Sequence, residues 1–423
     1  MQNKGSPATT TTTIMSTQPP SNNRRLVLFP LPFQGHINPM LQLAKILHAK
    51  GFKITIIHTQ FNPPPNQSNY PHFTFLSISD GLSKDSNVNL NTSNYVINFM
   101  NKSCIDPFRS CLARLLEEEP VACLISDSLW HFTQSVADGL NLPRIVLWTS
   151  SMFCILVYAA LPFVHENGNL KTTIQGMQLM TQKDILMIYS GGFEEGKLEL
   201  ISSMIKETNA SSGVIYNTFK ELEEPEFVAV SQDFHNPYPI GPFHNIAQMD
   251  EAEFANMAWG LASSKQRFLW VVRPGSVRGS EWLEALPKGL MDEVGERGCI
   301  VKWAPQQEVL AHPAIGGFWT HCGWNSTLES ICEGVPMICS PCSYDQPINA
   351  RYVAAVLRIG VMLENGMEVQ EIEKAITRVM VDKEGDEMRE RSKSLQEKVN
   401  LSLQKDGSAT QALENLVDYI LSF

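Results

Sequence analysis

The chain has 423 residues, of which 43% are hydrophobic and 18% charged, and its formal net charge is −11. This length exceeds what one hydrophobic core usually holds, so we expect a globular protein with two domains. The negative charge disfavours nucleic acid as a partner, because phosphate binding needs a basic surface. No apolar run reaches the ~18 residues of a membrane-spanning helix, so no membrane span is expected.

Residues 1–23 contain a threonine tract followed by proline, serine and asparagine, without apolar periodicity. This composition predicts a disordered tail; a transit peptide is the alternative, although no arginine precedes Arg24. The nine cysteines are odd in number and lack the spacing of a disulfide framework. We therefore expect reduced thiols and a cytoplasmic protein.

Apolar runs typical of strands alternate with helical patterns, which indicates parallel α/β construction. The first half predicts strands at residues 26–31, 54–58, 73–78, 122–126, 145–148 and 214–217, and helices at 39–49, 94–116 and 132–140. Residues 161–200 have no regular pattern and are predicted to form a loop-and-helix cover over a binding cleft. Together these segments predict an N-terminal, acceptor-binding domain at residues 24–235.

A proline-broken stretch after residue 235 predicts a shortened linker at residues 236–249. The second half predicts strands at residues 268–272, 300–303, 317–320, 335–339 and 361–364, and helices at 250–263, 306–311, 325–332, 346–356 and 369–381. We expect a C-terminal domain at residues 250–408, followed by an amphipathic helix at 409–423 that packs back on the N-terminal domain.

The segment from Phe29 to Pro39 ends a predicted strand and opens a helix, with Pro39 suited to the first helical turn. His36 lies at the positive end of that helix, which disfavours an imidazolium ion. We therefore predict a neutral His36 that can remove a proton from a hydroxyl group. The alternative is a histidine that only caps the turn.

Asp127 follows the predicted strand at residues 122–126. The carboxyl ends of parallel strands face the ligand crevice, so Asp127 can hold His36 in one tautomer and stabilise its charged form. The alternative is that Asp127 caps the helix at residues 132–140. The residues by themselves leave both interpretations open.

Residues 303–346 form the most informative run of the chain. This run combines an aromatic ring, a histidine beside a glycine turn, a polar cluster that opens a helix, and a final acid–amide pair: Trp303; His321 and Gly323; Asn325 and Ser326; Asp345 and Gln346. A helix start offers free N–H groups and about half a positive charge, which suits a diphosphate. Glu329 has an alternative role, because residues 326–329 also fit the pattern of a helix capping box.

The run at residues 303–346 resembles, over its full length, the signature box of the plant family-1 UDP-dependent glycosyltransferases. The segments around His36 and Asp127 resemble the same family, and the likeness extends from about Arg24 to Phe423, near the subgroup that holds steviol-type glucosyltransferases. The resemblance implies the GT-B fold, an α/β fold with two Rossmann-like parallel-sheet domains facing across a cleft.

The resemblance also implies a role for each residue of the predicted site. His36 is the catalytic base and Asp127 its partner. The residues implied to bind the UDP-sugar are Trp303, Ala304, Gln306, His321, Gly323, Trp324, Asn325, Ser326, Glu329, Asp345, Gln346 and Thr149. Among these, Trp303 stacks on the uracil, Glu329 accepts the ribose hydroxyls, and the helix start surrounds the diphosphate.

The implied reaction is an inverting transfer of glucose from UDP-glucose to a hydroxyl of a small plant secondary metabolite: a terpenoid, flavonoid or phenolic. Gln346, at the last position of the box, implies glucose rather than galactose. UDP-glucose is the co-substrate, and no separate cofactor is implied. No D-x-D motif occurs in the chain, which agrees with a metal-independent enzyme.

The stretch before the helix at residues 250–263 departs from the family. The family places there an apolar strand and a Ser/Gly turn, whereas residues 243–249 have no strand pattern. The first strand of a doubly wound sheet is central, and its loss leaves backbone groups of its neighbours without partners. We interpret this departure as a deletion rather than loop variation.

The deletion makes a second function class relevant, namely an inactive or weakly active variant that binds nucleotide sugar without turnover. A nicotinamide oxidoreductase is a third class, but the chain contains no G-x-G-x-x-G motif.

Overall fold

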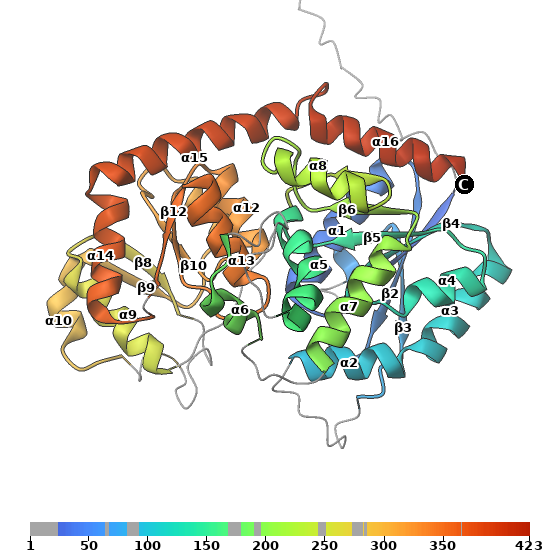
Figure 1. Ribbon diagram of the computed structural model, residues 1–423, viewed down its shortest axis with the longest axis horizontal. Helices are drawn as coiled ribbons and strands as arrows, with labels where there is room; N and C mark the ends of the chain where they lie inside the picture. The colour runs from blue at the N-terminus through green and yellow to red at the C-terminus, as the bar shows by residue number, and fades with distance from the viewer. Residues whose placement is uncertain are drawn as a thin grey trace, which may run out of the picture.

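The computed structural model describes residues 24–63, 67–82, 93–167, 179–189, 196–243, 251–272, 282, 286–364 and 366–423. The predicted tail at residues 1–23 lies outside this range. Two α/β lobes lie side by side, and a long helical segment runs across both (Figure 1). Here the N-terminal lobe means residues 24–243, and the C-terminal lobe means residues 251–402.

Seven parallel strands form one sheet in the N-terminal lobe, in the order β3-β2-β1-β4-β5-β6-β7. Their bounds are β1 Arg25–Phe29, β2 Lys53–Thr59, β3 Phe73–Ile78, β4 Val121–Asp127, β5 Arg144–Trp148, β6 Gly213–Tyr216 and β7 Pro237–Pro239. The first six confirm the predicted strands to within a few residues. The prediction of a linker from residue 236 was wrong at β7, because its prolines are accommodated at the edge of the sheet.

The helices of the N-terminal lobe are α1 Gln34–Ala49, α2 Ser93–Ser103, α3 Ile105–Glu118, α4 Thr133–Gly139, α5 Met152–Asn167, α6 Gln182–Tyr189, α7 Gly196–Asn209 and α8 Glu224–Asp233. α1 begins earlier than predicted, so Pro39 lies inside it rather than in its first turn. The predicted helix at residues 94–116 is interrupted near Cys104 and forms two helices. α5 fills part of the stretch predicted as irregular, because its side chains are apolar on nearly all sides and pack in the core.

The C-terminal lobe has two separate parallel sheets, one of β8 and β9 and one in the order β10-β11-β12. The strands are β8 Phe268–Val271, β9 Gly298–Val301, β10 Phe318–Thr320, β11 Met337–Cys339 and β12 Gly360–Met362. The strand predicted at residues 300–303 is β9, which ends at Val301. Trp303 therefore lies in the loop that follows.

The helices of this lobe are α9 Glu251–Ser263, α10 Leu290–Val294, α11 Gln306–Leu310, α12 Trp324–Cys332, α13 Gln346–Arg351, α14 Val369–Met380 and α15 Lys383–Ser402. The predicted helix at residues 346–356 is α13 followed by a π-helical turn at Tyr352–Leu357. The last helix, α16 Ser408–Ser422, comes after this lobe.

The separation into two sheets agrees with the predicted deletion. In the N-terminal sheet β1 lies between β2 and β4. The same winding in the C-terminal lobe requires a first strand between β8 and β10, yet in the described part of the chain β8 pairs only with β9 and β10 only with β11. Residues 244–250, where the strand pattern is absent from the sequence, lie outside the described residues.

α15 and α16 connect the lobes as a continuous arc (Figure 1). Leu416 and Ile420 of α16 are buried in the same cluster as Leu26 of the N-terminal sheet. The Tyr419 hydroxyl donates to the Ser212 carbonyl at 2.9 Å. The chain therefore returns to the N-terminal lobe after α15. The C-terminal lobe is thus connected to the N-terminal lobe both where the chain enters it and where the chain leaves it.

Among the described residues, no helix combines the length and apolarity needed to cross a membrane. All nine cysteines are free thiols, most of them buried.

A strand-plus-turn segment inserted before Asp250 is expected to stabilise the C-terminal lobe. The insert supplies two ladders of backbone hydrogen bonds, each bond contributing about 1 kcal/mol net, against an ordering cost of about 1–2 kcal/mol per residue. It also covers the apolar side chains around β8. The melting temperature followed by circular dichroism should rise, whereas a Gly/Ser insert of equal length should leave it unchanged or lower. Equal melting temperatures for both inserts would show that no strand position is vacant.

Candidate functional site

His36 and Asp127 come together because β1 and β4 are adjacent parallel strands, with Phe29 opposite Ser126. His36 lies in the first turn of α1, after β1, and Asp127 is the last residue of β4. His36 Nδ1 is 2.7 Å from Asp127 Oδ2, and the Leu129 N–H donates to Asp127 Oδ1 at 3.0 Å. With Nδ1–H donating to the carboxylate, Nε2 carries the lone pair that can accept a proton.

One of the alternatives for this pair is excluded by the structure. The residue before the first turn of α4 is Phe132, so Asp127 does not cap that helix. The pKa of His36 also moves in the direction opposite to the one expected from the helix end alone. Burial lowers the pKa of His36, but the charge and hydrogen bond of Asp127, together with the charge of Asp345, outweigh burial and raise this pKa above its ordinary value.

Thr149 lies beside His36, in the same lobe. It follows β5, and its Oγ1 is 3.1 Å from His36 Nδ1. The next residue, Ser150, donates to Asp345 Oδ2 across the cleft at 2.6 Å. The loop after β5 therefore contacts both the histidine of one lobe and the carboxylate of the other.

Asp345 and Gln346 stand where α13 begins. Asp345 Oδ2 also accepts a hydrogen bond from Asn349 Nδ2 at 2.9 Å. Gln346 Oε1 accepts the N–H groups of Cys342 at 2.9 Å and Ser343 at 3.2 Å. Both side chains are thus oriented by neighbours on their own helix and loop, and Asp345 faces both His36 and His321 closely enough to influence their pKa values.

The start of α12 docks on the N-terminal lobe. Asn325 Nδ2 donates to the Gly35 carbonyl at 3.1 Å, next to His36. Trp324 Nε1 donates to the Asn217 carbonyl at 2.7 Å, and Asn217 Nδ2 donates to Asn325 Oδ1 at 2.9 Å. Sequence analysis did not identify Asn217 as part of the site. Its position directly after β6, at the carboxyl edge of the sheet, could have indicated a role there.

His321 lies close against the turn that opens α12. Burial lowers the pKa of His321 to about 4, although Asp345 opposes this shift. The imidazole is therefore neutral at pH 7 and can donate one N–H. A Cβ at Gly323 would stand 2.5 Å from His321 Nε2, so only glycine permits this approach.

The loop after β9 carries Trp303, whose side chain is 65% exposed. Gln306 Nε2 donates to Ser326 Oγ at 3.2 Å and to Glu329 Oε2. The capping-box alternative for Glu329 was wrong, because α12 begins at Trp324 after Gly323, and Ser326 is inside the helix. Burial raises the pKa of Glu329 to about 7, despite hydrogen bonds from Gln306 and Gln307.

A cavity of about 720 Å³ brings residues of this loop together with the N-terminal lobe. Trp303, Ala304, Gln306 and Glu329 line it from one side, and Phe243 lines it from the other. The residues predicted to hold a nucleoside therefore share one cavity. Those predicted to meet the diphosphate and the sugar lie at the start of α12 and α13, beside His36.

Comparison with known proteins identifies the family. A family model described as UDP-glucoronosyl and UDP-glucosyl transferase matches residues 244–394. UDP-glycosyltransferase 76G1 of Stevia rebaudiana is 48% identical, with 94% of this chain and 97% of the relative covered. The chain belongs to the plant UDP-glycosyltransferases. UDP-glycosyltransferase 76B1 of Arabidopsis thaliana is 42% identical, with 94% and 98% covered.

Solved structures of this family have the same fold. The complex of Phytolacca americana UGT2 with UDP-2fluoro-glucose and pterostilbene has a TM-score of 0.79 at 23% identity, covering 94% of this chain and 100% of that chain. A UDP-glucose: anthocyanidin 3-O-glucosyltransferase in complex with UDP has a TM-score of 0.83 at 23% identity, covering 95% and 100%. The predicted family and GT-B fold are confirmed.

The alignment with the Stevia relative is 451 positions long, which exceeds the 423 residues of the whole chain. The relative therefore has residues inside the matched range that this UDP-glycosyltransferase lacks. This finding agrees with the missing strand between β8 and β10.

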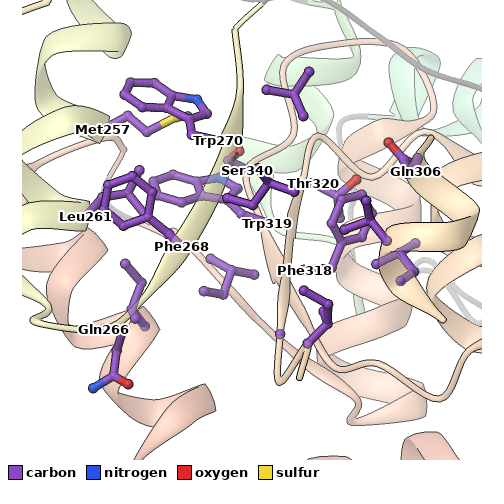
Figure 2. A pocket seen from close by; sticks show the side chains of 18 of the residues that line it. Met257, Leu261, Gln266, Phe268, Trp270, Gln306, Phe318, Trp319, Thr320 and Ser340 are labelled. Atoms are coloured by element: carbon purple, nitrogen blue, oxygen red, sulfur yellow. Dashed lines mark hydrogen bonds between the residues drawn. The ribbon is translucent and has the colours of Figure 1, made fainter. Parts of the chain in front are cut away.

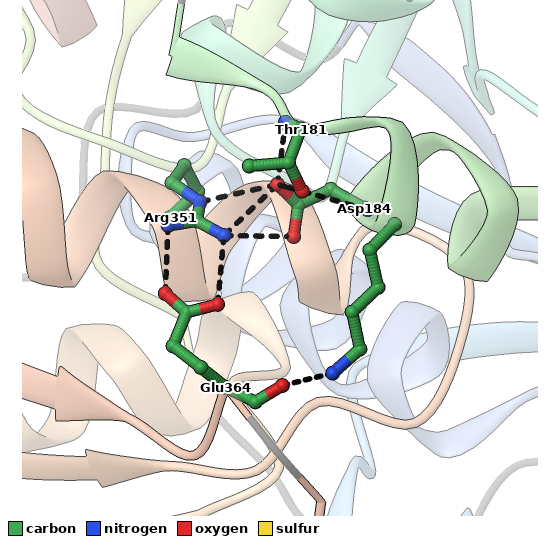
Figure 3. Close-up of polar contacts among 5 residues, drawn as sticks. Thr181, Asp184, Arg351 and Glu364 are labelled. Carbon is green, nitrogen blue, oxygen red and sulfur yellow. Dashed lines mark hydrogen bonds and ion pairs between the residues drawn. The ribbon is translucent and has the colours of Figure 1, made fainter.

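A second interlobe contact lies at the far end of α13 (Figure 3). Arg351 donates from Nε and Nη2 to Asp184 of α6, at 3.2 and 3.1 Å, and from Nη1 to Glu364 at 2.9 Å. Asp184 is fully buried and also accepts the Thr181 N–H at 2.7 Å. The ion pair fixes α6 against α13, the helix that follows Asp345. No local pattern predicts this ion pair, because its partners are far apart in the chain.

Arg351→Ala is expected to destabilise the protein by about 3 kcal/mol, because Asp184 keeps a buried charge without its cation. Arg378→Ala is the matched control, since Arg378 pairs with Glu384 in a half-exposed ion pair and should cost less than about 1 kcal/mol. Urea unfolding measures both. Equal losses would contradict a special role for the Arg351 pair.

Proposed function

We propose that this UDP-glycosyltransferase transfers glucose from UDP-glucose to a hydroxyl of a small plant secondary metabolite, a terpenoid, flavonoid or phenolic, with inversion at the anomeric carbon. One observation carries the proposal: the His36–Asp127 pair of one lobe faces Asp345 and the start of α12 in the other. A base and a diphosphate site on opposite sides of one cleft suit a direct displacement.

In this proposal His36 Nε2 takes the proton of the acceptor hydroxyl while the oxygen attacks the anomeric carbon. The bond from that carbon to the diphosphate oxygen breaks, and its electron pair leaves with UDP. Asp127 stabilises the imidazolium that forms, which is the same effect that raises the pKa of His36. A positioned base typically contributes about 10²–10⁴-fold to the rate.

The proposed donor site uses the residues of the box. The indole of Trp303 stacks on uracil, Ala304 and Gln306 meet its polar edge and the ribose, and Glu329 accepts ribose hydroxyls. The start of α12 receives the diphosphate. Its free N–H groups and the neutral His321 stabilise the charge that develops on the leaving UDP.

Asp345 and Gln346 are proposed to bind the sugar hydroxyls, with glucose favoured over galactose. Ser150 already donates to Asp345, so a bound sugar must share or replace that hydrogen bond. We further propose a reaction that needs neither a metal ion nor a separate cofactor, and a cytoplasmic location, which fits nine free thiols.

A second candidate function is a nucleotide-sugar binder without turnover. The split sheet of the C-terminal lobe favours this candidate, because β8 and β10 flank the donor side of the cleft. The deciding experiment is release of UDP from UDP-glucose with a panel of terpenoid, flavonoid and phenolic acceptors. Release of UDP that depends on an acceptor supports the enzyme. UDP binding without turnover supports the binder, provided that the strand insert before Asp250 restores turnover.

His36→Ala should abolish transfer while leaving UDP affinity within a few-fold, because His36 acts on the acceptor rather than the nucleotide. Product formation and UDP titration calorimetry on the same preparation measure the two effects. Retained turnover, or a large loss of UDP affinity, would contradict the role of a base.

Trp303→Ala should weaken UDP binding by about 1–3 kcal/mol, as for other stacks between a base and an aromatic ring. Trp303→Phe is the control and should retain most of the affinity, because it keeps an aromatic face. Calorimetry with UDP measures both variants, and an unchanged affinity for Trp303→Ala refutes the stacking.

Activity should fall at acid pH, because only neutral His36 accepts a proton. Asp127 raises the pKa of His36, so the neutral fraction of the wild-type protein declines as the pH drops through that raised value. Asp127→Asn removes the charge, and the acid limb of kcat/KM should move to lower pH while the plateau drops roughly 10²–10⁴-fold. A limb that stays in place would show that another group titrates.

A further inference from the structure

Asn349 of α13 is completely buried where the two lobes meet, and its side chain contacts three separate segments. Its amide oxygen, Oδ1, accepts a hydrogen bond from the Ser151 hydroxyl, in the loop after β5, at 3.0 Å. Its amide nitrogen, Nδ2, donates to the Cys322 carbonyl at 3.1 Å and to Asp345 Oδ2 at 2.9 Å. The oxygen and both hydrogens of this amide are therefore used, each toward a different segment.

The neighbours of Asn349 permit only one orientation of its amide group. The Ser151 hydroxyl accepts the Cys154 N–H at 3.0 Å, so its own hydrogen is available for Asn349 Oδ1. The other two partners are a carbonyl and a carboxylate, which accept hydrogen bonds and must therefore face the amide nitrogen. A side chain of the same volume without this arrangement of donors and acceptors would leave buried polar groups without partners. The position requires an amide.

Packing of α13 does not depend on this amide. Ile348 and Ala350, on either side of Asn349 in the chain, are fully buried in the apolar cluster that covers this part of the lobe. A buried polar side chain between them costs free energy unless all of its hydrogen bonds are made. The amide therefore specifies a geometry rather than adding to the apolar core.

Asp345 is the partner through which this geometry reaches the site. Its Oδ2 accepts hydrogen bonds from Asn349 in the same lobe and from Ser150 of the N-terminal lobe. Its Oδ1 accepts none from the described part of the chain, and the residue is half-buried. Two donors thus hold one oxygen of the carboxylate, and the other oxygen is available to a ligand.

The turn before α12 is held by Asn349 and by a second contact. Cys322 has a φ of 62°, in the left-handed region that residues other than glycine rarely adopt. Its carbonyl accepts from Asn349, and its N–H donates to Thr320 Oγ1 at 3.1 Å. Thr320 is the last residue of β10 and lies in the wall of the cavity between the two sheets of the C-terminal lobe (Figure 2). The contact with Thr320 does not involve Asn349, so it remains when the amide is removed.

We propose that Asn349 is a positioning residue for the sugar of the donor. Its amide holds Asp345 Oδ2 so that Oδ1 faces the hexosyl group, and its contact with Ser151 makes this orientation depend on the docking of the two lobes. Asn349 itself does not touch the substrate. The inference rests on the proposed function in one respect, namely that Asp345 binds the sugar.

Titration calorimetry with UDP and with UDP-2-fluoroglucose, in the absence of acceptor, separates the nucleotide from the sugar without requiring turnover. Asn349→Ala removes a donor to a carboxylate and should weaken the affinity for UDP-2-fluoroglucose at least about tenfold. The affinity for UDP should change less than about threefold, because the turn before α12 keeps its contact with Thr320. Equal losses for the two ligands would overturn the proposal, since they indicate a general effect on the donor site.

Asn349→Asp separates hydrogen bonding from shape. This variant has nearly the same volume, but it places an oxygen against Asp345 Oδ2 and the Cys322 carbonyl, which only accept. The loss of affinity for UDP-2-fluoroglucose should be at least as large as in Asn349→Ala. An unchanged affinity would show that the side chain only fills space. If Asn349→Asp fails to fold, Asn349→Ala and the double variant with Asp345→Ala still decide between the two outcomes.

A double-mutant cycle shows whether Asn349 acts through Asp345. Asp345→Ala should weaken UDP-2-fluoroglucose binding at least about tenfold, and the addition of Asn349→Ala should then cause less than about twofold further loss. Asn101→Ala is the matched control. Asn101 is also buried and donates to two carbonyl groups, those of Ile97 at 3.0 Å and Leu129 at 2.9 Å, but it belongs to the N-terminal lobe. It should leave both affinities unchanged.

Additive losses in the cycle, or an undiminished affinity in Asp345→Ala, would contradict the proposal, because Asn349 would then not act through Asp345. The proposed function fails in a different way. A protein that shows the expected pattern of affinities but releases no UDP with any acceptor would refute glucosyl transfer and still support the positioning role of Asn349.

Discussion

The convergence of parallel strand ends at one edge of each sheet is the constraint on which the site depends. It places Asp127, the last residue of β4, within 2.7 Å of His36, which follows β1, although 91 positions separate them in the chain. The same rule places His321 and the start of α12 after β10. The lobes then meet edge to edge, so that Asn325 reaches the Gly35 carbonyl next to His36. The residues predicted to act as base and as diphosphate site therefore face each other, and the loop after β5 contacts both His36 and Asp345.

The contact between the two lobes consists of polar side chains at its centre, and further contacts stabilise it at its periphery. Asn217, Asn325 and Asp345 exchange hydrogen bonds across the cleft, while the Arg351–Asp184 pair and the return of α16 hold the two lobes together outside it. Buried polar contacts of this kind are favourable only when every partner is in place. The relative position of the lobes is therefore specified narrowly, as a reaction between two bound substrates demands.

The C-terminal lobe contributes the residues around the start of α12 and α13 to the site, but its strands do not form one continuous sheet. β8 and β9 form a sheet separate from β10, β11 and β12, and a cavity lined in part by His321 lies between the two sheets. Family membership follows from the whole sequence and does not depend on a strand in that place. Between β8 and β10, the described residues form no ladder of backbone hydrogen bonds.

The sequence by itself determined the family and the alternation of strands and helices, and it predicted that His36 and Asp127 act together, because these depend on local pattern and motif. It also suggested the deletion, since residues 243–249 lack the apolar pattern of a central strand. Only the tertiary structure decided the pKa of His36, where Asp127 and Asp345 from distant segments outweigh the helix end. The hydrogen bonds of Asn217, the ion pair of Arg351 and the edge strand at Pro237–Pro239 likewise depend on contacts between residues far apart in the chain, which no local pattern encodes.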